Sequence, residues 1–185
     1  MGKNKSYHKL LYSFCLNPSL TFNGQDNDEV PILLLRAHPI TQIPWIINDF
    51  FLLLFIFGLN IFLPSYLKPY QIIFVNLFGL SLVFSYFYFN FLHWFFNMGI
   101  VTNKRILDID FYGLVYKETT IAILDKVEDI TAKVGGFFSS FFNYGNLFIQ
   151  TAGTEANIEF INIPKPQEVV KIINQLLKNG KSNLI

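Results

Sequence analysis

Two long apolar stretches, residues 45–63 and 72–92, dominate the hydrophobic pattern of this chain. A helix needs roughly 20 apolar residues to cross a hydrocarbon core ~30 Å thick, and both stretches have about that length. The linker between them, Pro64–Gln71, contains two prolines and is so short that the chain must reverse direction. The pattern therefore predicts a transmembrane helical hairpin over residues 43–94.

The pattern changes period after the second stretch. Short runs rich in Val, Ile, Thr, Phe and Tyr alternate with turn residues, and Asn103 sits between two such runs, where a tight turn requires a residue that tolerates positive φ. Six or seven antiparallel strands are expected. Apolar residues then repeat at helical spacing over about 166–178. Residues 95–185 are therefore predicted to form a mainly-β split barrel or curved antiparallel sheet, capped by a C-terminal α-helix.

The chain before the hairpin, residues 1–42, is mixed and polar and is expected to be a cytoplasmic N-terminal segment. Its Val30–Pro39 stretch is apolar and bounded by prolines. This stretch predicts an extended segment that runs up to the membrane and can add a strand to the later β domain.

Positive charge predicts which way the hairpin crosses the membrane. Of the 14 Lys and Arg residues, four precede the first apolar stretch, nine follow the second and only Lys68 lies in the turn. Cytoplasmic loops carry an excess of Lys and Arg. We therefore expect a two-pass protein of the cytoplasmic membrane, with both termini and the β domain on the cytoplasmic side.

Composition narrows the classes of function. The net charge is +1, and nine basic and nine acidic residues follow Met98, so no basic field would attract nucleic acid. A single cysteine, Cys15, excludes a cysteine metal cluster. No phosphate-binding glycine loop, nucleophile elbow or zinc motif is present. The sequence thus predicts no catalytic residues, no cofactor and no metal.

Two kinds of residue are candidates for contact with the membrane surface. Trp45 and Trp94 lie at the ends of the hairpin, where tryptophan favours the interface between lipid and water. Lys104 and Arg105 follow the second span closely and are candidates for weak contact with anionic lipid headgroups. The alternative for this basic pair is an ordinary charged hairpin tip.

The segment after Gly135 and Gly136 holds four phenylalanines around two serines and is a candidate interaction loop. The rings have three possible places: the inner leaflet or the hairpin, a self-association surface, or the core of the barrel. The four residues are Phe137, Phe138, Phe141 and Phe142.

Several local phrases, in this order after two spans, resemble the bacterial pleckstrin-homology (PH-like) membrane proteins of the YdbS type. The resemblance extends from about residue 32 to 177 and implies a PH-like fold in a membrane-tethered binding or scaffolding protein, with no catalytic residues to carry over. The phrases are Val101–Leu107, Leu124–Ile130, Asn143–Leu147, Thr151–Gly153 and Ile163–Pro166.

Two functions from different classes fit these observations. The favoured one is a membrane-anchored interaction module at the inner leaflet that forms a homo-oligomer or binds a membrane-protein partner. The alternative is a lipid-binding or small-molecule-binding accessory component of a transport or secretion system. An exposed strand edge or flat apolar surface favours the first, and a polar cavity open towards the bilayer favours the second.

Overall fold

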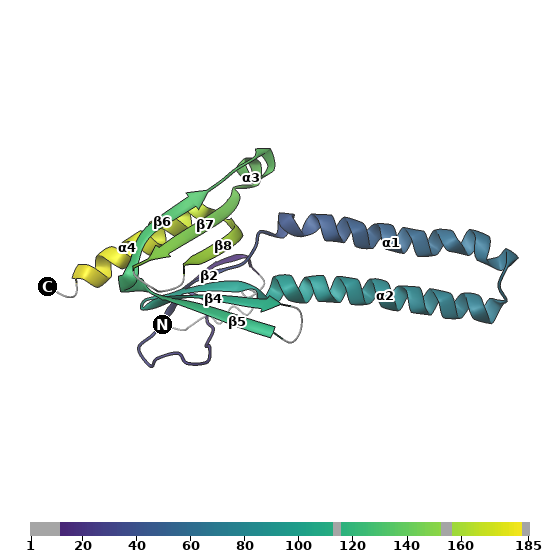
Figure 1. Cartoon of the computed structure of the whole chain (residues 1–185), viewed down its shortest axis with the longest axis horizontal. Helices are drawn as coiled ribbons and strands as arrows, with labels where there is room; N and C mark the ends of the chain where they lie inside the picture. Colours follow the sequence, from purple (N-terminus) through teal and green to yellow (C-terminus); the bar gives the residue numbers. More distant parts are fainter. Residues whose placement is uncertain (1–11, 113–115, 153–156, 183–185) are drawn as a thin grey trace, which may run out of the picture. The chain divides into compact units, whose positions relative to one another are not determined.

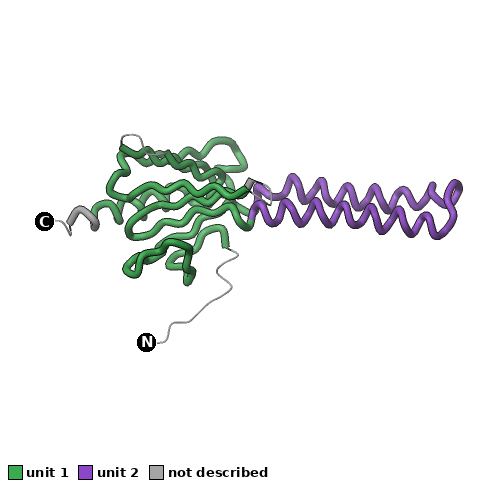
Figure 2. Tube along the Cα trace, turned by 60° about the horizontal axis from the view of Figure 1, so that its bottom comes forward, with its two compact units in different colours: residues 1–39, 95–185 green, residues 40–94 purple. Residues whose placement is uncertain are grey.

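The computed structural model describes residues 12–112, 116–152 and 157–182 of the chain (Figure 1). It divides into two compact units (Figure 2). Unit 1 combines residues 1–39 with 95–185, and unit 2 comprises residues 40–94. The N-terminal segment therefore belongs to the same unit as the C-terminal β domain, although the hairpin separates them in sequence.

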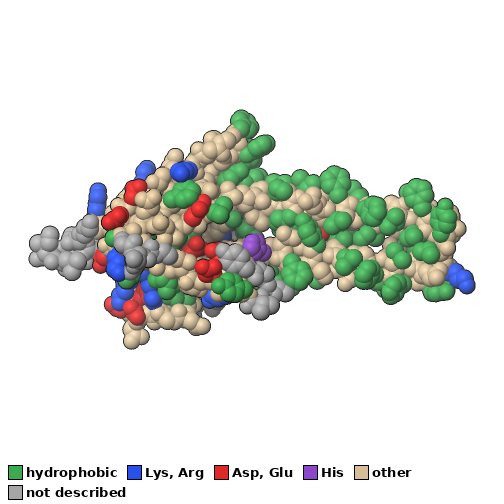
Figure 3. All heavy atoms as spheres, viewed as in Figure 1, with side chains coloured by type: hydrophobic (Ala, Val, Ile, Leu, Met, Phe, Trp, Pro, Cys, Tyr) green, Lys and Arg blue, Asp and Glu red, His purple; other side chains and the backbone are tan. Residues whose placement is uncertain are grey.

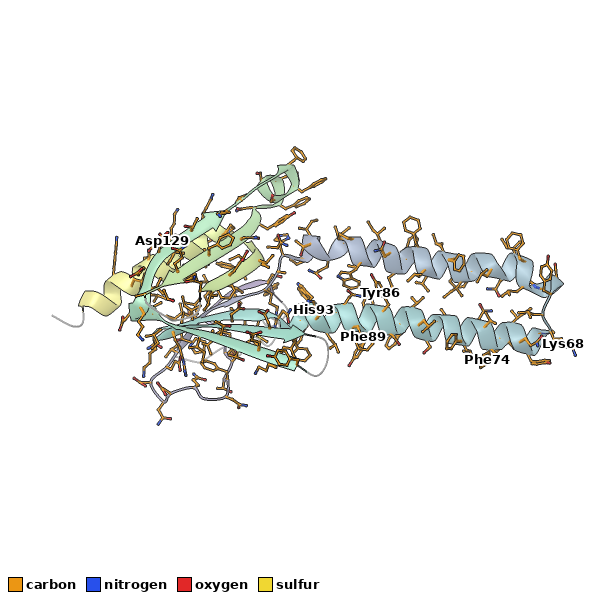
Figure 4. All side chains as sticks on the ribbon, viewed as in Figure 1. Lys68, Phe74, Tyr86, Phe89, His93 and Asp129 are labelled. Carbon is orange, nitrogen blue, oxygen red and sulfur yellow. The ribbon has the colours of Figure 1, made fainter. Side chains whose placement is uncertain are left out.

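Unit 2 is a pair of antiparallel helices. A short 3-10 turn, η2 (Pro39–Gln42), leads into α1 (Ile43–Phe62), and a second one, η3 (Leu63–Ser65), ends it. Helix α2 (Pro69–Phe96) returns and runs into unit 1, with Lys68 at the turn and His93 near its other end (Figure 4). Both helices are long and apolar enough to cross a membrane, as the sequence predicts.

Most apolar side chains of these two helices face outward, as lipid-facing residues do. Few are buried, and large rings such as Phe57 and Phe74 are well exposed. The two helices make few contacts with each other. One of these contacts is polar: the side-chain amides of Asn60 and Asn76 exchange hydrogen bonds of 2.9 and 2.7 Å. Close to that pair, Gly79 lets the Ile56 side chain approach its backbone.

The first sheet of unit 1 has five antiparallel strands in the spatial order β1-β2-β3-β4-β5. The N-terminal segment supplies two of them, and β2 pairs with β3, which confirms that the stretch before the hairpin adds a strand. The strands are β1 (Phe14–Leu16), β2 (Pro31–Leu35), β3 (Met98–Thr102), β4 (Arg105–Tyr112) and β5 (Tyr116–Ile123).

The second sheet has three antiparallel strands, and a six-residue helix joins the first two (Figure 1). A 3-10 turn, η4, leads into it from the first sheet, and α4 follows the last strand. These elements are η4 (Leu124–Lys126), β6 (Val127–Lys133), α3 (Phe137–Phe142), β7 (Tyr144–Thr151), β8 (Ile158–Pro164) and α4 (Pro166–Ser182).

The main core of unit 1 lies between the two sheets and α4. Fully buried residues come from both sheets, such as Leu33, Ile106 and Ile149, and the helix contributes Val169 and Ile173. The apolar stripe of the C-terminal helix thus has the role that its periodicity predicts. Two antiparallel sheets closed by a C-terminal helix confirm the predicted fold class.

A second, smaller cluster lies on the other face of the first sheet. Buried Leu34, Ile100 and Leu107 form it, and Leu20 and Phe22 of the N-terminal segment pack against it. In the sequence, apolar and acidic residues alternate over Ile106–Phe111, which predicts a half-exposed strand. Instead, the N-terminal segment covers the Leu107 face of β4, while Asp108 shares the face of Ile106, which belongs to the main core.

Candidate functional site

The basic pair Lys104 and Arg105 is held by an acidic loop of the N-terminal segment. Arg105 donates from Nε to Oε1 of Glu29 at 2.9 Å and from Nη2 to Oε2 at 2.8 Å. The Lys104 ammonium lies 3.1 Å from the carboxylate of Asp26 and 2.7 Å from that of Asp28. Each cation thus has acidic partners from a segment that lies more than 70 residues earlier.

The ion pair of Arg105 with Glu29 and the ion pair of Lys104 with Asp28 differ strongly in burial. The Glu29 side chain is fully buried, and the hydroxyl of Thr102 also donates to it at 2.8 Å. The hydrogen bond from Arg105 outweighs desolvation and lowers the pKa of Glu29 to about 2. The Asp28 carboxylate is exposed, and its hydrogen bond with Lys104 lowers its pKa. The buried pair fixes the loop, whereas the exposed one adds little.

The basic pair also lies away from the point where α2 joins unit 1. Strand β3 begins at Met98, directly after α2, and Lys104 follows its far end. Five strand residues span about 17 Å at ~3.3 Å each. Contact of Lys104 and Arg105 with headgroups stays a prediction, and their neutralisation by acidic residues does not favour it.

Trp45 and Trp94 lie at the same end of unit 2, as an antiparallel pair of helices requires. The indole of Trp45 donates to the side-chain oxygen of Gln42 at 2.8 Å and lies edge-on to the Phe87 ring at 5.4 Å. The Trp94 ring lies 6.1 Å from that of Phe91. One ring at the start of α1 and one near the end of α2 suit a single interface level, which stays a prediction.

The phenylalanine segment forms the helix α3, which the sequence did not indicate. Phe137, Phe138 and Phe141 are 77%, 67% and 72% exposed, and only Phe142 is half-buried. The alternative that these rings fill the core is therefore wrong for three of the four. The buried residue of this helix is Ser139. Space-filling atoms show hydrophobic side chains gathered on α3 (Figure 3).

Strand β5 forms one edge of the five-stranded sheet and pairs in it with β4 alone. The eight residue pairs of β4 and β5 follow one another without a bulge. Tyr116, Ile121 and Ile123 are exposed apolar residues on this strand, whereas Ala122 is buried. In the sequence, the small Ala122 stands between the large apolar residues Ile121 and Ile123. This pattern is the signal that could have indicated an apolar surface on β5.

Three carboxylates share the core-side face of the first sheet. Asp110 is paired with Glu118 in the register of β4 and β5, and Asp108 lies two residues before Asp110. Desolvation, together with the charges of Asp110 and Glu118, raises the pKa of Asp108 to about 7. Within the described ranges, these acids do not form a group that could hold a metal ion.

The chain matches the family of bacterial PH domains over residues 49–177, which is more than half of its length. It belongs to this family. Among solved structures, a DUF1696 family protein with a pleckstrin-homology domain from Shewanella loihica PV-4 matches at 20% identity. That match covers 44% of this chain and 68% of the other, with a TM-score of 0.33. The curated proteins contain no significant match.

In this bacterial PH domain protein, the candidate residues lie in separate parts of the fold. The basic pair lies at the β3–β4 turn, the exposed rings lie on α3 in the other sheet's connection, and β5 supplies an apolar edge. These are separate surfaces rather than a pocket of converging groups. Such surfaces are suited to binding other molecules by contact, and the proposals below concern the two apolar ones.

Proposed function

We propose that this chain is a membrane-anchored interaction module of the inner leaflet, which assembles with itself or with a partner protein and catalyses no reaction. Its membership of the bacterial PH domain family and its two candidate membrane helices support the anchored architecture. The distribution of Lys and Arg supports a cytoplasmic position for both termini and for unit 1.

The observation that carries the assembly proposal is the edge strand β5. An unpaired strand edge exposes backbone N–H and C=O groups that another strand can complete. Proteins blunt such edges with bulges, prolines and charges. In β5 there is no proline and no bulge against β4, and its two charged residues, Lys117 and Glu118, lie near the start of the strand, before exposed Thr119, Ile121 and Ile123.

The other strand edges are less suited to pairing. Strand β1 at the opposite edge of the sheet has only three residues. In the second sheet, β6 carries three charged residues, Glu128, Asp129 and Lys133, and a register shift interrupts its pairing with β7. A register shift also interrupts the pairing of β7 with the other edge strand, β8, where Asn162 has a positive φ of 55°. Among the described strands, β5 is the long and regular edge, so we place the protein-binding surface there.

The test is a photo-reactive amino acid placed at Ile121 of the full-length protein in living cells. A second copy would give an adduct of twice the 21.5 kDa of the chain, and a different partner would give an adduct that mass spectrometry identifies. Ile121 lies at the edge and is exposed, whereas Gln175 is an exposed position on α4 that serves as the control.

A charge-based variant tests the same surface in detergent. Ile121→Lys/Ile123→Lys places two charges on the edge and should abolish the adduct and lower the mass to that of a monomer. The control, Asn174→Lys/Gln175→Lys, adds the same charge to the exposed face of α4 and should change neither. Absence of any adduct from Ile121, together with a monomeric wild type, would refute the assembly proposal.

A further inference from the structure

Helix α3 buries one of its two serines and exposes three of its four phenylalanines. Ser139 is buried, and its hydroxyl donates to the carbonyls of Gly135 and Gly136. The rings of Phe137, Phe138 and Phe141 face outward. Three exposed aromatic rings can bury roughly 300–500 Å² on contact, which is as large as the largest apolar patch of a typical monomer. An exposed apolar surface of this size is typical of a site that binds another molecule or a membrane.

The three exposed rings are adjacent on one short helix. Gly136 with φ of 98° precedes the helix and Asn143 with φ of 53° ends it, and both residue types tolerate this region of the backbone. The Phe137 ring lies 5.7 Å from that of Phe138 and 6.3 Å from that of Phe141. The three rings thus form one continuous aromatic face.

The contacts within unit 1 place α3 beside the connection to the first candidate span. Tyr144 lies two residues after the end of the helix, and its ring stacks on that of His38 at 5.5 Å. The His38 amide donates to the carbonyl of Asn162 at 2.7 Å, which ties this point to the second sheet. His38 lies seven residues before Trp45. Seven extended residues span about 25 Å at most. The chain therefore keeps His38 within about 25 Å of Trp45, and Tyr144 is in contact with His38.

The charge around α3 also suits an anionic surface. The chain contains no acidic residue between Asp129 and Glu155, and the basic Lys133 precedes the helix. The cytoplasmic leaflet carries a negative surface potential, which repels acidic segments and attracts lysine. A protein partner can pair with acidic residues, so binding to a protein would not require their absence around α3.

We propose that Phe137, Phe138 and Phe141 insert into the surface of the bilayer that the hairpin crosses. The inserted helix gives unit 1 a third attachment to the membrane, besides the two chain connections, and so limits how the second sheet can turn against the lipid surface. The proposal rests on the membrane anchoring proposed above and is independent of assembly through β5.

The depth of a nitroxide label tests this insertion in the full-length protein. The label is placed by Phe138→Cys in a Cys15→Ala background, in vesicles of phosphatidylcholine mixed with phosphatidylglycerol. Gln175→Cys on the exposed face of α4 is the control for water, and Phe78→Cys in α2 is the control for lipid. Oxygen collides with labels in lipid, and a water-soluble nickel chelate collides with labels in water.

We expect the label at position 138 to collide with oxygen and to be protected from nickel, as at position 78 and unlike position 175. Adding Phe137→Ser/Phe141→Ser should shift it towards nickel accessibility, because the other two rings hold the helix in the lipid. If nickel reaches the label at position 138 while Phe137 and Phe141 are unchanged, the proposal is overturned. Protection of this label from both oxygen and nickel would overturn it too, because such protection indicates contact with protein. A label at position 78 that nickel reaches would instead refute the membrane anchoring itself, and the insertion with it.

Discussion

Replacing Glu29 with Gln removes the charge from a buried ion pair while keeping the shape of the side chain. The carboxylate of Glu29 accepts two hydrogen bonds from Arg105 and one from Thr102, and it joins the N-terminal segment to the β3–β4 turn. We expect the Glu29→Gln variant to loosen the N-terminal segment, including β1 and β2, while the rest of unit 1 stays folded.

The magnitude follows from the pKa of Glu29. Hydrogen bonds from Arg105 first, and from Thr102 and the Asp26 amide, lower this pKa from 4.5 to about 2. Each pKa unit corresponds to about 1.4 kcal/mol, so ionised Glu29 stabilises the fold by about 3 kcal/mol. Because the folded-state pKa lies below the unfolded one, this contribution is complete above pH 4.5 and is lost as the pH falls towards 2. Glutamine keeps one oxygen that can accept from Arg105 but places an N–H group where the second carboxylate oxygen accepted, so about 3 kcal/mol is the expected scale of the loss.

Hydrogen exchange of the full-length protein in detergent measures the effect directly. A loss of about 3 kcal/mol corresponds to roughly 100-fold faster exchange when opening is in rapid equilibrium. Amides in the hairpin of β1 and β2, such as Asn17 bonded to Ile32 and Arg36 bonded to Ser13, should exchange ten to 100 times faster at pH 7.

The neighbouring acid provides a matched control. Asp28→Asn removes one of the two exposed acidic partners of Lys104 and should change the same exchange rates less than threefold, because exposed ion pairs contribute little. If Glu29→Gln also changed exchange less than threefold at pH 7, the reasoning that this buried pair fixes the N-terminal segment would be refuted.

Three further variants test other parts of the structure. Asp108 has a folded-state pKa of about 7 against 3.8, so the wild type should lose about 2–3 kcal/mol of stability between pH 5 and 7, and urea unfolding of Asp108→Asn should lack this loss. Gly145→Ala puts a Cβ 2.4 Å from the Lys133 carbonyl oxygen and should lower the melting temperature through about 1–3 kcal/mol of strain, whereas Gly135→Ala, which meets nothing within 4 Å, should not. Asn60→Leu leaves the Asn76 amide without its partner and should destabilise the helix pair by about 1–2 kcal/mol in a detergent melt, with partial recovery in the Asn60→Leu/Asn76→Leu variant.

The three long helices of this chain could be predicted from sequence because each has a strong local pattern. The two apolar stretches are long enough to define α1 and α2, and the stripe that includes Val169 and Ile173 defines α4. Helix α2 continues to Phe96, beyond the predicted span of residues 72–92, because no turn residue interrupts it. The turn at Asn103 was equally visible, since it separates two apolar runs.

The contacts that decide the surfaces could not be predicted, because they join distant residues. Lys104 and Arg105 form a basic pair in sequence, but their acidic partners lie in a loop before the hairpin. Phe137 to Phe142 resemble core residues by composition, and only the packing of Ser139 shows that the rings face outward. The position of β5 at an edge depends on strand order, which local patterns do not determine.

The central claim is that α1 and α2 cross the cytoplasmic membrane and leave unit 1 on the inner side. Single cysteines at Lys68, in the turn between the helices, and at Gln175, on α4, test it in a Cys15→Ala background with a membrane-impermeant maleimide on spheroplasts. The account predicts that Lys68→Cys reacts in intact spheroplasts, while Gln175→Cys reacts only after the membrane is permeabilised. Equal reaction of both positions in intact spheroplasts, or of neither, would contradict it.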